Sequence, residues 1–153
     1  MVIPIKMFEH MKKRLLLTGL LTSIINLLLN ALAYAMILKN FYRSHPSGPE
    51  AFMKQLHRPP DQLILWAMAG TSLMMGFFIT TVMKWSGAET FMTGLKKAFV
   101  MGFLFWGSVN FGLYASSTVF SAPGMFVDLL CSGTAMTISG AFAAWMLGKR
   151  NGL

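Results

Sequence analysis

The chain has 153 residues, a net charge of +8 at pH 7 and an apolar fraction of 55%, and only 12% of its residues are charged. A soluble domain carries about 25% charged residues, so these values exclude an ordinary water-soluble protein and predict lipid as the solvent. The length fits one domain, residues 1–153. Because the basic residues lie beside apolar runs and not on a face with stacking aromatics, we expect no nucleic-acid partner.

Four long apolar runs predict an all-α fold, a polytopic membrane protein built as a bundle of four transmembrane helices. About 20 helical residues cross the ~30 Å hydrocarbon core of a bilayer, and none of the runs contains Lys, Arg or Glu. The first run is longer than the ~7–15 residue core of a signal peptide, so we expect it to remain as a helix. The predicted spans are residues 15–38, 63–83, about 98–121 and about 125–148.

Positive charge is shared unequally between the two sides of this predicted bundle. Of the 13 Lys and Arg residues, nine fall on the side of the termini and the second loop, and four fall in the first loop. Basic residues favour the cytoplasmic side, so both termini are predicted to be cytoplasmic. The nine are Lys6, Lys12, Lys13, Arg14, Lys84, Lys96, Lys97, Lys149 and Arg150, and the four are Lys39, Arg43, Lys54 and Arg58.

The first loop, residues 39–62, is the longest, and its sequence predicts a short helix at the membrane surface. In the stretch "PEAFMKQLH", Pro49 suits the first helical position, and the apolar residues that follow would rest together on the interface. Asp61 is expected to cap the second span. His45 and His57 lie far apart in this loop without a nearby cysteine, which predicts solvated side chains and no metal site.

The first span combines a polar face with a leucine-rich face. Successive helical residues are separated by about 100°, and on that wheel Asn26 and Asn30 share one side with other small or polar residues. Such a side should turn towards the bundle interior or another protein, away from lipid. The remaining members of this polar stripe are Gly19, Thr22, Ser23, Ala33 and Tyr34.

The third span carries a second polar stripe, and it predicts the partners of Asn26. Asn110 and Tyr114 lie on one face of this span, together with Ser117 and Ser121. In one interpretation Asn26 bonds to Asn110 or Tyr114 and holds two helices together, since interhelical hydrogen bonds in membranes contribute roughly 0.6–2 kcal/mol each. The alternative is a small transporter or binder of an apolar or weakly polar ligand. Its polar-lined pocket between the first and third spans would be formed by Asn26, Asn30, Asn110 and Tyr114.

The fourth span has small residues along one face, which predicts a helix-packing seam. Small side chains let helix backbones approach closely in a membrane. The short connection "SAPG" at 121–124 joins this span to the third, so the two should form an antiparallel hairpin. The seam consists of Gly133, Thr137, Gly140, Ala144 and Gly148.

Asp128 is the only acidic residue inside a predicted span. Near the start of the fourth span it could satisfy free backbone N–H groups of the first turn, and the alternative is a proton or cation site. No hydrolase, phosphate-loop or paired-cysteine motif occurs, and the spans contain no histidine. We therefore expect no enzyme activity, no metal and no cofactor.

Three stretches resemble small bacterial four-helix inner-membrane families of unknown function: "ALAYAMILKNFY", "GFLFWGSVNFGLYASS" and "DLLCSGTAMTISGAFAAW". The resemblance implies four spans in a bacterial inner membrane, and it implies no activity or site. The small-residue faces and the aromatic-rich third span lead us to expect a protein that acts through helix packing. Its partners would be the lipid bilayer and either further copies of itself or the other subunits of a larger membrane complex.

Overall fold

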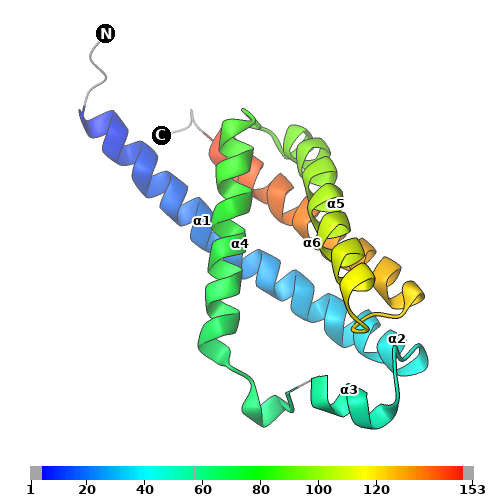
Figure 1. The fold of residues 1–153 in the computed structure, drawn as a ribbon. Helices are drawn as coiled ribbons and strands as arrows, with labels where there is room; N and C mark the ends of the chain where they lie inside the picture. The colour runs from blue at the N-terminus through cyan, green and yellow to red at the C-terminus, as the bar shows by residue number, and fades with distance from the viewer. Residues whose placement is uncertain (1–4, 57, 150–153) are drawn as a thin grey trace.

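The computed structural model describes residues 5–56 and 58–149, and every regular element in this part of the chain is helical (Figure 1). An all-α fold is therefore confirmed. Four helices are long and apolar enough to cross a membrane, as the sequence predicts. The elements are α1 (Ile5–Ala33), η1 (Tyr34–Leu38), α2 (Lys39–Ser44), α3 (Glu50–Leu56), η2 (Pro60–Gln62), α4 (Leu65–Trp85), α5 (Phe91–Ser116) and α6 (Ala122–Gly148).

The first helix is longer than the apolar run that predicts it. It continues through α1, η1 and α2 without leaving the helical region, since both Ala33 and Lys39 at the borders of η1 have right-handed helical backbone angles. The segment η1 is a π-helical turn, in which the N–H of Lys39 donates to the carbonyl of Tyr34. This wider turn accommodates one extra residue within the helix, and the apolar pattern does not reveal it.

The third long helix begins and ends earlier than predicted, over Phe91–Ser116 and not over 98–121. Thr90 and Thr93 form a reciprocal capping box at its start, with each side chain accepting from the backbone N–H of the other. The first two turns contain Lys96 and Lys97, which a hydropathy criterion excludes from the apolar run. The predicted boundary therefore marks the end of the charged turns and not the start of the helix.

Two other predictions are wrong in detail, the cap of the second span and the place of Ser121. Asp61 does not cap α4, because it lies within the 3-10 turn η2, and α4 begins at Leu65 after Ile64 without a side-chain cap. Ser121 does not belong to the polar face of the third span. It is the N-cap of α6 and accepts from the N–H of Gly124 at 3.3 Å.

The short helix in the first loop is present as α3. It begins at Glu50, so Pro49 stands immediately before the first helical residue and supplies its carbonyl to the N–H of Met53. His45 stacks on Phe41 with ring centroids 4.3 Å apart. His57, predicted to be a solvated loop residue, lies outside the described residues.

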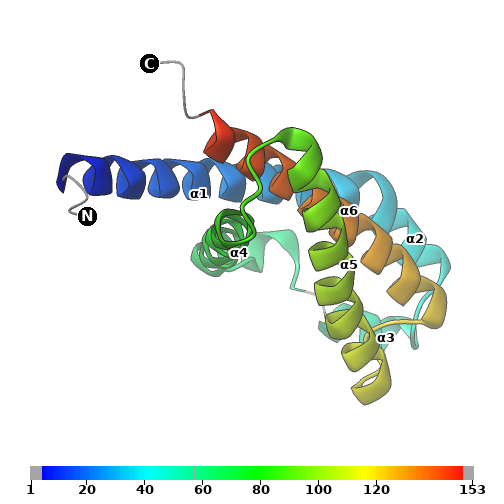
Figure 2. The ribbon, with the colours of Figure 1, turned by 90° about the horizontal axis from the view of Figure 1, so that it is seen from above.

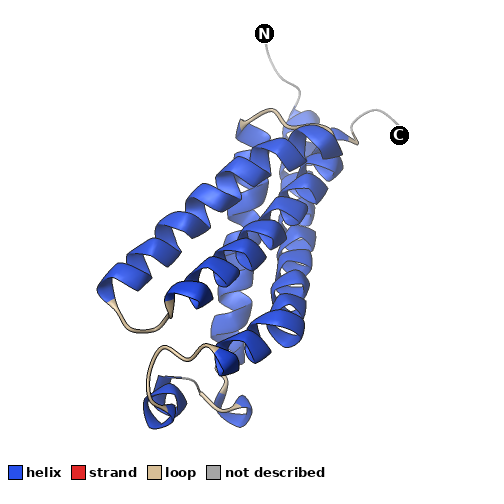
Figure 3. Ribbon diagram, turned by 90° about the vertical axis from the view of Figure 1, so that its right-hand side faces the viewer, coloured by secondary structure: helices blue, strands red, loops and turns tan. Residues whose placement is uncertain are grey.

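The long helices are arranged around α6. This helix packs against α5, α1 and α4, and α1 also packs against α4, whereas α4 and α5 have little contact with each other. Figure 2 shows α6 beside both α1 and α5. In Figure 3 the start of α1 and the end of α6 lie at the same end of the bundle as the α4–α5 connection, and the α5–α6 connection lies at the other end.

The α5–α6 pair forms the predicted antiparallel hairpin, joined by residues 117–121 and not by 121–124. Glycine is required where the two backbones meet. A Cβ added to Gly140 would lie 2.3 Å from the Cβ of Ala98, and one added to Gly94 would lie 2.3 Å from the Cβ of Ala144. The side of α6 predicted as a packing seam thus lies against α5 at Gly133, Gly140 and Ala144, while Gly148 lies against Glu89 in the α4–α5 turn.

The crossing of α1 and α4 is equally close. A Cβ on Gly76 would lie 2.4 Å from the backbone nitrogen of Ser23, and one on Gly19 would lie 2.5 Å from the ring of Phe77. Thr22, Ser23 and Asn26 are buried, as their position on the polar stripe predicts, while the leucine-rich side of α1 is exposed. Tyr34 does not follow the stripe and is exposed, because the π-helical turn begins at this residue.

Candidate functional site

The asparagines of α1 bond to α6 and not to α5. The side-chain amide of Asn26 donates to the hydroxyl of Ser139 on α6 at 3.2 Å. Asn30 donates to the backbone carbonyl of Asn26 at 2.8 Å and to its side-chain oxygen at 3.2 Å. The predicted hydrogen bond from Asn26 to Asn110 or Tyr114 is therefore wrong. Its physical reason is the position of α6, which packs against α1 in the place the sequence assigned to the third span.

Asn110 is buried on α5, and its side chain forms a hydrogen bond within its own helix. Its side-chain amide donates to the carbonyl of Trp106 at 3.0 Å, and its side-chain oxygen has no partner among the described residues. Tyr114, one turn later, is 44% exposed. Among the described residues, Asn110 and Tyr114 thus do not join Asn26 and Asn30 in one hydrogen-bonded polar group.

Within the part of the chain that the structure describes, three buried threonine hydroxyls also lack a hydrogen-bond partner: Thr18, Thr22 and Thr80. All three have 0% exposure, and they lie on α1 and α4, the two helices that cross at Ser23 and Gly76. A buried hydroxyl without a partner costs about 1–3 kcal/mol. The polar stripe of the first span includes Thr22, whereas the sequence gives no signal for Thr18.

Asp128 does not act as a helix cap. It lies beyond the first turn of α6. In that turn the hydroxyl of Ser121 already accepts a hydrogen bond from the N–H of Gly124. The carboxylate accepts a hydrogen bond of 2.8 Å from the hydroxyl of Tyr42 on α2. The bond joins the end of the first long helix to the beginning of the last, and neither sequence interpretation of Asp128 includes this partner.

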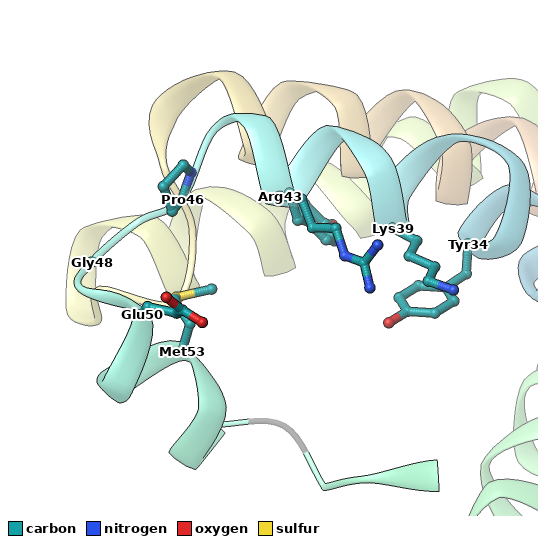
Figure 4. A pocket seen from close by; sticks show the side chains of 8 residues that line it. Tyr34, Lys39, Arg43, Pro46, Gly48, Glu50 and Met53 are labelled. Carbon is teal, nitrogen blue, oxygen red and sulfur yellow. The ribbon is translucent and has the colours of Figure 1, made fainter.

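A cavity of about 590 Å³ opens beside this junction. One wall comes from the first helix, where Tyr34, Lys39 and Arg43 extend towards the same space (Figure 4). The opposite wall consists of the loop that follows α2 and the first turn of α3, with Glu50 and Met53. The ring of Tyr42, whose hydroxyl bonds to Asp128, completes the lining.

The π-helical turn explains why these side chains meet. Lys39 and Arg43 are four residues apart and therefore share one face of α2. Tyr34 and Lys39 are five apart, which would place them about 140° apart on a regular α-helix. The hydrogen bond from the N–H of Lys39 to the carbonyl of Tyr34 closes a turn of five residues, and this brings both residues to the cavity.

An apolar groove of about 310 Å³ lies between α1 and α6. Leu29, Ala33 and Ile37 form its side on the first helix, and Cys131 and Ile138 belong to its side on α6. Ala33 and Ile37 border or belong to the same π-helical turn that contributes Tyr34 to the cavity. Residues of this turn therefore line two sites, the cavity with the charged side chains and the apolar groove.

The charged and aromatic lining of the cavity was not recognised in the sequence. Lys39 and Arg43 were counted only as loop charges that orient the protein, and Tyr42 was assigned no role. Their signal was present as two basic residues four apart, which directly follow an apolar run and have a tyrosine near each of them. Among the described residues, no group of three or more His, Cys, Asp or Glu side chains could hold a metal ion.

Searches against protein-family models, curated proteins and solved structures gave no match to this chain.

Proposed function

We propose that this chain is an integral membrane protein that acts through helix packing, either as a homo-oligomer or as an accessory subunit of a larger membrane complex. The observation that carries the proposal is the uncovered apolar surface of α4 and α5. Only 17% of the apolar stretch of each helix is buried inside the molecule, against 50% for α6. Such a surface requires lipid or other membrane proteins around it.

The most exposed side chains support a bilayer as the surrounding medium. Trp66 and Trp85, near the two ends of α4, are each 80% exposed, and Met74 between them is 79% exposed. Tryptophans at both ends of an apolar helix match the two interfaces of a membrane. The excess of basic residues on the side of the termini and the α4–α5 turn supports a cytoplasmic position for that side. The membrane we propose is a bacterial inner membrane.

Two glycines with open space beside them support contact with other helices. A Cβ on Gly70 of α4 or on Gly112 of α5 would meet nothing within 4 Å. Glycine lowers helix stability by roughly 1 kcal/mol relative to alanine, so it has no benefit for the isolated chain at these positions. A second helix can approach closely at a glycine, and we assign Gly70 and Gly112 to the contact with a partner.

Membrane insertion is tested by extraction of native membranes with alkaline carbonate, which removes peripheral proteins. We expect the chain to stay in the membrane pellet. Native mass spectrometry of protein released in mild detergent then measures the assembly. A multiple of 17.0 kDa indicates an oligomer, and a larger complex of defined composition indicates an accessory subunit. A protein extracted by carbonate contradicts the membrane assignment.

The contact itself is tested with a photo-crosslinker attached to one cysteine in a Cys131→Ala background. Gly70→Cys should give a protein adduct of one defined mass. Leu16→Cys is the matched control, because Leu16 is 55% exposed on the leucine-rich side of α1 and should contact lipid. Protein adducts that are equal at both positions, or absent at both, would contradict the proposed contact.

A further inference from the structure

The cavity beside α2 has a chemical character that helix packing does not explain. Two basic side chains, Lys39 and Arg43, point into it from one wall, and Tyr34 lies beside them (Figure 4). Neither the two cationic groups nor the hydroxyl of Tyr34 has a hydrogen bond or ion pair with another described residue. The wall therefore presents free donors to a volume large enough for a small ligand.

The charge of the lining limits the ligand. Lys39 and Arg43 contribute two positive charges to one wall, and Glu50 on the opposite wall has an interaction of its own. Arg and Lys are the preferred partners of phosphate oxygens, and Arg binds them through two parallel N–H groups. A phosphodiester offers these oxygens together with a negative charge, which two basic side chains on one wall attract.

The position of the cavity agrees with that chemistry. The span Lys13–Ser44 has 32 residues, so it is about 48 Å long and exceeds the ~30 Å hydrocarbon core. Lys39 follows directly on the last apolar residues of this span, and α4 begins at the same end of the bundle with the exposed Trp66. In the proposed membrane setting the cavity lies at the level of the lipid headgroups.

We propose that the cavity formed by Tyr34, Lys39 and Arg43 binds a singly charged phosphodiester. The group could come from a phospholipid headgroup or from a water-soluble phosphate ester. The apolar groove along Ala33 and Ile37 would suit one acyl chain of a phospholipid. Because this inference places the cavity at the membrane surface, it rests on the proposed membrane insertion.

The test uses the full chain in mild detergent with added phosphatidylglycerol, and native mass spectrometry measures the retained lipid. The double variant Lys39→Gln/Arg43→Gln should retain it at least tenfold more weakly, because two charge-assisted contacts are lost. The matched control is Lys84→Gln/Lys96→Gln, which removes the same charge from exposed positions on other helices. An equal loss in both double variants, or no retention by the original chain, would overturn the proposal.

Two single variants sharpen the result. Tyr34→Phe removes only a hydroxyl from the wall and should weaken retention, and Glu50→Gln removes the opposing negative charge and should strengthen it. Circular dichroism of each variant establishes that the helices are intact. Unchanged retention in both single variants would contradict the assignment of this cavity.

The source of the phosphate is identified by competition with glycerol 3-phosphoglycerol, the headgroup without acyl chains. Displacement of the lipid at similar concentrations supports a water-soluble ester, and its failure to compete supports a phospholipid. Carbonate extraction of the same proteins separates the two proposals. A chain that stays in the membrane but retains no lipid contradicts only the cavity assignment, whereas a chain extracted by carbonate contradicts the proposed insertion.

Discussion

Asn26 has a different role from the one its place in an apolar run suggests. Its amide donates to Ser139 of α6, and its two oxygens accept from Asn30 in the next turn. Asn30 thereby donates a hydrogen bond to the side-chain oxygen of Asn26, whereas Ser139 of α6 bonds to the side-chain amide. In the proposed membrane setting no water replaces a missing partner, so we expect the two asparagines to act as one unit that orients α1 against α6.

We expect Asn26→Ala to lower the free energy of unfolding by about 1 kcal/mol, because the hydrogen bond to Ser139 is lost. A double-mutant cycle with Ser139→Ala, measured by unfolding in mixed micelles, should give a coupling of about 0.6–1.7 kcal/mol. Ser108→Ala is the control, since Ser108 is exposed on α5, and it should change stability by less than about 0.5 kcal/mol. A coupling of zero would show that the pair does not join the helices.

The hydrogen bond between Tyr42 and Asp128 also joins parts of the chain that are distant in the sequence. Tyr42→Phe should release α2 from α6 and reduce stability by about 1 kcal/mol. Hydrogen exchange of residues 39–44 should become faster, while exchange in α5 remains unchanged. Tyr114→Phe provides the control, because no described residue bonds to the hydroxyl of Tyr114. Equal exchange in both variants would contradict a structural role for the bond.

For the helices, the sequence predicts which helices are present better than it predicts where each helix begins and ends. The four apolar runs predict four helices because their length and composition are sufficient by themselves. The start of α5 was missed because Lys96 and Lys97 interrupt the apolar run, although Thr90 and Thr93 formed a recognisable capping pattern. The π-helical turn could not be predicted, since the five residues Tyr34–Leu38 are apolar or aromatic and fit a regular helix equally well.

The crossing of α1 and α4 depends on Gly76, and α4 contains its own control. Gly76→Ala should destabilise the protein strongly, because the new Cβ would lie 2.4 Å from the backbone of Ser23 and the helices would have to separate. Gly70→Ala introduces the same atom into open space, so it should be neutral or stabilise by up to about 1 kcal/mol. Thermal unfolding in detergent compares the two variants, and similar effects would contradict the close crossing.

For the molecule as a whole, the helical wheel identifies which side of a helix is buried but not which helix covers it. The wheel correctly predicted that Ser23 and Asn26 are buried. It could not show whether α5 or α6 is the helix that covers them. That choice depends on α6, whose small residues let it pack against three helices at once. The cavity at Lys39 and Arg43 was missed for a similar reason, because the loop and α3 that close it come together only in the folded chain.

The arrangement of the helix ends leads to a prediction for the protein in its membrane. The α4–α5 turn lies at one end of the bundle and the α5–α6 connection at the other. In a Cys131→Ala background, Glu89→Cys and Thr118→Cys place single thiols at these two exposed positions. The excess of basic residues near Glu89 favours the cytoplasm, so an impermeant maleimide added to intact cells should label only position 118.

Inside-out vesicles should show the opposite result, with labelling at position 89 alone. Labelling of both positions in detergent establishes that each thiol is reactive, so protection in cells or vesicles reflects its side of the membrane. A reversed pattern would overturn the orientation while leaving four spans intact. Labelling of both positions from the same side would mean that α5 does not cross the bilayer, and it would contradict the four-span arrangement itself.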